Sequence, residues 1–142
     1  MSKMIGAALL SSAMFLISAS AFGSPPTAVL STVKTYSLGE SPESIAIDKA
    51  GNSFVSIGNT IRKRTPAGVE STFMTLPIAA FVLGVKVGPD GCVYNTSTSL
   101  DPAVVGAFIW KTCTAGAPTI FATLDPSGGP NDLAFDDSRN LF

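Results

Sequence analysis

Histidine is absent from all 142 residues of this sequence. The absence excludes a histidine general base, Ser-His-Asp or Cys-His nucleophilic chemistry, and histidine-rich metal sites from this chain. Charge is also scarce, because only 13% of the residues are charged and the formal net charge is −1. The basic footprint that nucleic-acid binding needs is therefore missing, and we expect no nucleic-acid partner. Any chemical site in this chain must use carboxylate, amide, hydroxyl or backbone groups.

The segment 1–21 has the pattern of a targeting sequence. Lys3 precedes an apolar stretch over 4–17, and the segment closes with Ala19-Ser20-Ala21. This combination predicts a secretory signal peptide over 1–21 and export of the protein, by secretion or into a periplasm. The apolar stretch is short and interrupted by serines, which disfavours the alternative of an uncleaved membrane anchor. After cleavage we expect no association with a membrane.

Cysteine is also rare, with two residues in the whole chain. In an exported chain, two cysteines suggest one disulfide. Cys92 begins one expected strand and Cys113 ends the next, so a hairpin centred near 101–103 would bring them almost opposite each other. The alternative is a pair of buried free thiols.

One sequence frame occurs three times. It is a strand-like segment, a turn and an aromatic residue two positions later, found at 43–52 with Phe54, at 83–92 with Tyr94, and at 131–140 with Phe142. Each of the first two repeats accommodates four short strands separated by Gly and Pro. Four strands with a period of about 40 to 50 residues indicate a β-propeller blade. A parallel β-helix is the alternative. The sequence therefore predicts an all-β fold.

The expected elements divide the chain after the signal peptide into a linker over 22–37 and a partial propeller over 38–142. Alternation over 28–38 predicts a strand there as well. Blade 1 covers 38–77, with strands at 45–47, 54–57, 60–64 and 71–76. Blade 2 covers 78–125, with strands at 85–87, 92–95, 108–111 and 119–124. A third blade begins over 126–142, with strands only at 133–135 and 141–142. We expect Trp110 to lie in the core between blades.

The spacing between equivalent positions of the first two repeats reveals an insertion. The interval from Ile61 to Ile109 is longer by eight positions than the interval from Glu43 to Leu83. An insertion, at about 98–105, therefore lies between the second and third strands of blade 2. In an up-and-down blade it lies at the channel end where Glu43, Leu83 and Asn131 begin the innermost strands.

Glu43 and Asn131 are the candidate cation ligands. Both precede a turn aspartate by five positions, and acidic and amide oxygens at a channel mouth suit Ca²⁺, with Mg, Mn or Zn as other options. The alternative is structural: Glu43 is then a solvated loop residue and Asn131 a turn former after Pro130.

The segments Pro42–Asp48 and Gly129–Asp136 resemble propeller motifs of the senescence-marker-protein (regucalcin), gluconolactonase and luciferin-regenerating-enzyme family, and the frames also resemble NHL-type repeats. The resemblance implies a six-bladed propeller with a divalent cation in its channel and lactone hydrolase activity on a small-molecule substrate. It implies that Glu43 binds the metal, and that Asn131 contacts metal or substrate with Asp132 beside it. The aromatic that is common after the family's first-blade motif is replaced here by Ala46-Ile47.

A non-catalytic propeller of the NHL type, which binds a ligand or protein at the same face, is the alternative function. Six blades of this size need about 250 residues. We therefore expect the chain to represent the amino-terminal part of a longer propeller, with the family's remaining ligands in later blades.

Overall fold

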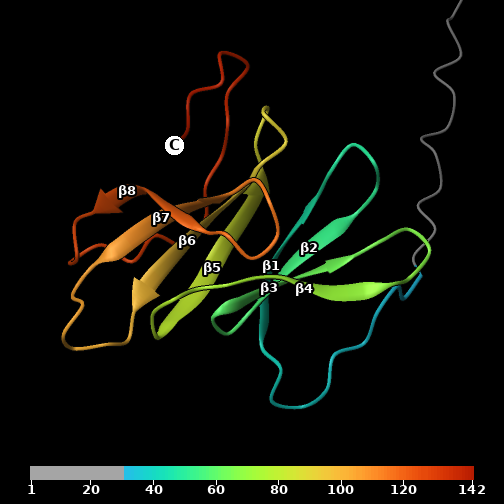
Figure 1. Ribbon diagram of the computed structural model, residues 1–142, viewed down its shortest axis with the longest axis horizontal. Coiled ribbons are helices and arrows are strands. Elements are labelled where there is room, and N and C mark those ends of the chain that lie inside the picture. The colour runs from blue at the N-terminus through green and yellow to red at the C-terminus, as the bar shows by residue number, and fades with distance from the viewer. Residues whose placement is uncertain (1–30) are drawn as a thin grey trace, which may run out of the picture. The chain divides into compact units, whose positions relative to one another are not determined.

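The computed structural model describes residues 31–142. These residues form eight strands and no helix: Pro42–Ile47 (β1), Ser53–Ile57 (β2), Thr60–Arg64 (β3), Glu70–Thr75 (β4), Ala80–Val87 (β5), Val93–Ser99 (β6), Ala107–Thr112 (β7) and Thr119–Leu124 (β8). They build two antiparallel four-stranded sheets, ordered β1-β2-β3-β4 and β5-β6-β7-β8 (Figure 1). Each sheet is one repeat, which confirms the all-β, four-stranded-blade prediction. The described residues contain no helix with the length and hydropathy of a membrane span.

The turn between β1 and β2 shows why the repeat frame folds as a hairpin. The Asp48 carboxylate accepts hydrogen bonds from the backbone amides of Ala50 (2.9 Å) and Asn52 (2.8 Å), and from the Asn52 side chain (2.7 Å). Gly51 adopts a φ of 81°, which glycine tolerates at no steric cost. Asp136 and Asn140 repeat these side-chain contacts in the third frame. The turn aspartate therefore organises its own hairpin.

The two sheets pack face to face, with their innermost strands β1 and β5 side by side (Figure 1). The main hydrophobic cluster draws buried side chains from both sheets, and its members include Phe54, Ile61 and Met74 of the first and Val85, Val93 and Trp110 of the second. Trp110 is 4% exposed and donates a hydrogen bond to Ser97 Oγ at 2.8 Å, which confirms its place in the core between blades.

The two blades repeat their side-chain contacts as well as their strands. In each, an aromatic on the second strand packs edge-on against a phenylalanine on the fourth, and a lysine on the third strand lies over it. The pairs are Phe54–Phe73 (5.0 Å) with Lys63 (5.6 Å), and Tyr94–Phe121 (5.3 Å) with Lys111 (5.3 Å). The equivalences that the sequence frame predicts are thus true structural equivalences.

Two sequence-based expectations need correction. Residues 31–38 form no strand, because they pair with no neighbouring strand in the described part of the chain; residues 28–30 lie outside it, as does the predicted signal peptide. The third repeat has no regular strands at 133–135 and 141–142. It has one isolated bridge, Phe135–Leu141, beside two backbone hydrogen bonds between Ala134 and Phe142, because segments of two or three residues make too few pairs for a regular ladder.

Candidate functional site

Both inner strands contain a β-bulge at the same position of the repeat, which is Glu43, a candidate ligand, in blade 1 and Leu83 in blade 2. The irregularities fall at Glu43–Ser44 in β1 and at Leu83–Gly84 in β5. Ser56 on β2 is fully buried; its Oγ accepts a hydrogen bond from the Ser44 amide at 2.9 Å and donates one to the Leu83 carbonyl at 3.1 Å. One hydroxyl thus links the bulges of both blades.

Two further hydroxyls bind backbone amides near these bulges. Thr96, the blade 2 equivalent of Ser56, accepts a hydrogen bond from the Gly84 amide at 2.8 Å, and Ser44 Oγ accepts one from the Val85 amide at 3.1 Å. A bulge interrupts the ladder of backbone hydrogen bonds, so the freed amides need such partners. Glu43 therefore sits on backbone that is fixed on both sides.

Glu43 lines a groove between the inner strands of blades 1 and 2. The groove has a volume of about 360 Å³ and is lined by Gly39, Ser41, Glu43, Ile57, Gly58, Phe81 and Leu83. Glu43 is exposed and has no ion-pair or hydrogen-bond partner for its carboxylate among the residues described. The carboxylate is thus available to a ligand.

Asn131 and Asp132 lie beside the bulge of β5, outside this groove. A Cβ on Gly84 would lie 2.6 Å from the Asp132 Cα and 3.1 Å from the Asn131 carbonyl oxygen, so the two backbones are in close contact. Asp132 forms an ion pair with Lys86 at 3.2 Å. The Leu133 amide, and secondarily Lys86, hold the pKa of Asp132 below its usual range. The structure therefore brings Glu43 together with Leu83, and Asn131 together with Gly84.

A divalent cation fits this site only in part. Over residues 31–142, the groove contains one carboxylate, and no cluster of three Asp, Glu, His or Cys side chains includes Glu43. Ca²⁺ takes six to eight oxygen ligands, so a cation at Glu43 needs several more oxygens than the described groove supplies.

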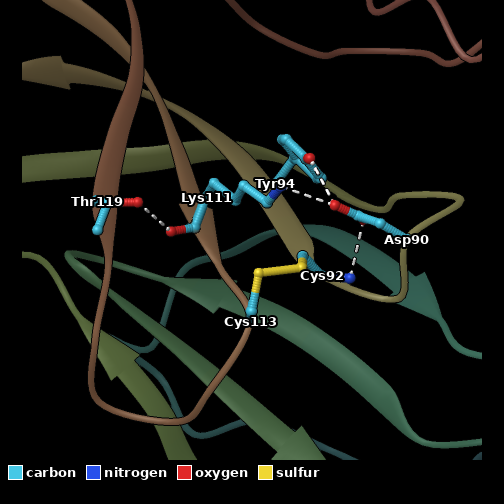
Figure 2. Close-up of a disulfide and its surroundings, with 6 residues drawn as sticks. All are labelled: Asp90, Cys92, Tyr94, Lys111, Cys113 and Thr119. Atoms are coloured by element: carbon cyan, nitrogen blue, oxygen red, sulfur yellow. Dashed lines mark hydrogen bonds and ion pairs between the residues drawn. A yellow bond between two sulfur atoms is a disulfide. The ribbon is translucent and has the colours of Figure 1, made fainter.

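The two cysteines are joined by a disulfide between the start of β6 and the end of β7, with an S–S distance of 2.07 Å (Figure 2). Asp90 lies beside the sulfurs, but a disulfide offers no thiolate to a metal, so this cluster is not a metal site. Burial works against ionisation of Asp90, yet hydrogen bonds from Lys111, the Cys92 amide and Tyr94 outweigh it and lower its pKa. The disulfide and the contacts of Asp90 therefore stabilise the β6–β7 hairpin.

Phe81 is a groove residue that the sequence analysis missed. It stands in blade 2 where Ser41 stands in blade 1, just as Leu83 corresponds to Glu43, and both pairs line the groove. The constant offset between blades was the available signal, but position 81 precedes the recognisable part of the frame.

Two antiparallel four-stranded blades, packed face to face with their inner strands adjacent, define this chain as part of a β-propeller. No family model matches the sequence. No curated protein matches it at a significant level.

Solved structures support the propeller fold. The PQQ-bound aldose sugar dehydrogenase of Streptomyces coelicolor aligns with a TM-score of 0.63 and 23% identity, over 80% of this chain and 40% of its own. A putative oxidoreductase (glucose dehydrogenase) of Thermus thermophilus aligns with a TM-score of 0.56 and 17% identity, over 72% of this chain and 36% of its own. A Bacteroides caccae protein of unknown function aligns with a TM-score of 0.52 and 18% identity, over 74% of this chain and 38% of its own. At these identities the likeness shows the fold alone, and the chain spans well under half of each matched chain.

Proposed function

We propose that this chain forms blades of a propeller that binds a small sugar-like molecule at the Glu43 end of its channel and acts on it as a divalent-metal-dependent lactonase. The observation that carries the proposal is the free carboxylate of Glu43, held on a braced bulge at the edge of a groove. The two structural neighbours described as sugar dehydrogenases favour a sugar-like ligand.

In this proposal Glu43 is one ligand of the cation, and the remaining oxygens come from the ligand or from groups other than the described residues of the groove. When bound, such a cation would polarise a lactone carbonyl and stabilise the developing oxyanion. The chain's own residues fix the backbone beside Glu43 and give the ligand an apolar wall at Phe81 and Leu83. We also propose that the protein is exported, since a disulfide persists in oxidising compartments.

The test is calorimetric titration of CaCl₂, and then of MgCl₂, MnCl₂ and ZnCl₂, into the wild-type protein and the Glu43→Gln variant. We expect Glu43→Gln to weaken cation affinity by about tenfold or more, since it removes a charged ligand. Glu70→Gln is the control, because Glu70 lies on the outer strand β4 and pairs with Lys34. Hydrolysis of an aldonolactone, followed by acid release, should fall with the same substitution.

Equal cation binding by wild type and Glu43→Gln would refute the metal site. A wild-type protein that binds a sugar-like ligand without any cation would instead favour the second candidate, a non-catalytic binding propeller of the NHL type. The presence of only one carboxylate among the residues that line the groove favours that candidate.

A further inference from the structure

The eight-residue insertion in blade 2 lengthens a strand pair as well as a loop. In blade 1 the first residue pair of the inner hairpin is Pro42–Ile57, and its equivalent in blade 2 is Val82–Ser97. Blade 2 continues beyond this with two more pairs, one of them Phe81–Thr98. Phe81 therefore lies on a strand extension that blade 1 lacks, at the channel end where Glu43 lies.

The extension is held firmly by backbone contacts. The Val82 amide donates to the Gly58 carbonyl of blade 1, and the Leu100 amide donates to the Ala79 carbonyl, both at 2.8 Å. Ala80 and Val82 are 3% and 0% exposed, whereas Phe81 between them is 50% exposed. Because successive side chains of a strand point to opposite faces, the buried neighbours turn the Phe81 ring outward.

The groove consequently has two chemically different walls. Phe81 and Leu83 of blade 2 supply an apolar wall, and the equivalent residues of blade 1, Ser41 and Glu43, supply a hydroxyl and a carboxylate. A ligand that fills this groove must have an apolar face and, on another side, groups that donate hydrogen bonds.

We propose that Phe81 determines specificity by binding the C–H face of a six-membered polyhydroxylated ring, a pyranose or an aldonolactone, whose hydroxyls turn toward Ser41 and Glu43. The electron-rich face of an aromatic ring attracts the polarised C–H groups of a sugar, and an ionised carboxylate accepts up to two neighbouring hydroxyl protons. An open-chain aldonate lacks the flat C–H face and carries a negative charge, like Glu43. This inference rests on the proposed function, because it names the ligand class of the same groove.

The test uses D-glucono-δ-lactam, a ring analogue that does not hydrolyse, with D-gluconate as the open-chain comparison. Calorimetry on the full protein should show Phe81→Ala weakening lactam binding by about tenfold, and Phe81→Tyr keeping it within about twofold, since tyrosine retains the ring. Phe121→Ala is the matched control, because Phe121 is 52% exposed on the outer strand β8. A cooperative thermal unfolding transition verifies that each variant is folded.

CaCl₂ titration of the same variants separates this inference from the proposed function. Phe81→Ala should bind Ca²⁺ as the wild type does, while Glu43→Gln should not. Three results would overturn the role of Phe81 and leave the metal site standing. They are equal lactam binding by Phe81→Ala and the wild type, a wild type that prefers gluconate to the lactam, and a wild type that binds Ca²⁺ but no lactam. If Glu43→Gln binds Ca²⁺ as the wild type does, while lactam binding is intact and still depends on Phe81, the metal site alone is overturned.

Discussion

At the scale of single residues, Gly84 controls how the third repeat approaches the second. Its φ is not in the left-handed region, so backbone freedom does not require glycine here. Space does, because Asn131 and Asp132 lie against the position of its missing side chain. Asn131 and Asp132 therefore lie where they do only because Gly84 has no side chain beyond a hydrogen atom.

We predict that Gly84→Ala lowers the free energy of unfolding by about 1–3 kcal/mol, the usual range for overpacking. The added methyl group would meet the Asp132 Cα at 2.6 Å and Oδ1 at 2.9 Å. Denaturant unfolding measures the effect. Gly129→Ala serves as the control, since nothing lies within 4 Å of its Cβ position. Equal stabilities for the two variants would show that residues 131–132 do not pack against β5.

The residues of the groove differ in how far the sequence alone predicts them. The repeat frame singled out Glu43 because a carboxylate in phase with Asn131 is visible without a structure. Phe81 escaped, since its significance depends on pairing with Thr98, and that pairing exists only because the insertion extends the hairpin. A local pattern does not show which of two adjacent segments continues a ladder.

At the scale of elements, the hairpin β6–β7 has a covalent brace. Val93 and Thr112 are the last paired residues of the two strands, and Cys92 and Cys113 follow directly beyond them. The bridge therefore continues the ladder and closes a segment with a sequence separation of 21, which contains the loop near the channel end.

We predict that Cys92→Ala combined with Cys113→Ala lowers the free energy of unfolding by about 3 kcal/mol, as expected for a loop of this length. Thermal and denaturant unfolding measure the loss. Wild-type protein under reducing conditions should unfold at the same midpoint as the double variant. An unchanged midpoint in the double variant would mean that the hydrogen bonds of β6–β7 and the Asp90–Lys111 contact suffice alone.

The strands themselves were largely predictable, because alternation of apolar and polar side chains specifies a half-buried strand. The bulges at Glu43–Ser44 and Leu83–Gly84 were not predicted. They depend on buried hydroxyls of neighbouring strands, Ser56 and Thr96, which replace ladder partners. The prediction of strands at 133–135 and 141–142 was wrong, because segments of two or three residues become strands only when a sheet surrounds them.

At the scale of the whole molecule, equivalent residues have different surroundings. Val85 of blade 2 is 0% exposed, whereas Ile45, its equivalent in blade 1, is 58% exposed. Ala46 and the cluster around Phe54 occupy the space between the blades. The same phase of the repeat is thus core in one blade and surface in the other, over the part of the chain that the structure describes.

We predict that Val85→Ala lowers the free energy of unfolding by about 2 kcal/mol, through lost burial and a cavity. Ile45→Ala removes more atoms, yet it should change stability by no more than about 0.5 kcal/mol, as at an exposed site. Chemical denaturation of both variants provides the measurement. A larger loss for Ile45→Ala than for Val85→Ala would mean that the Ile45 face is covered in the protein in solution.

The repeat, the order of the four strands in blades 1 and 2, the insertion and the alignment of Cys92 with Cys113 all follow from the sequence alone. These features are local or periodic, because turn residues and side-chain alternation act over a few positions. The exposure of Ile45, the burial of Val85 and the groove that Phe81 shares with Glu43 depend instead on how the two sheets pack. Burial and groove shape depend on which sheet packs against which face, and this contact joins residues that lie a whole repeat apart in the chain.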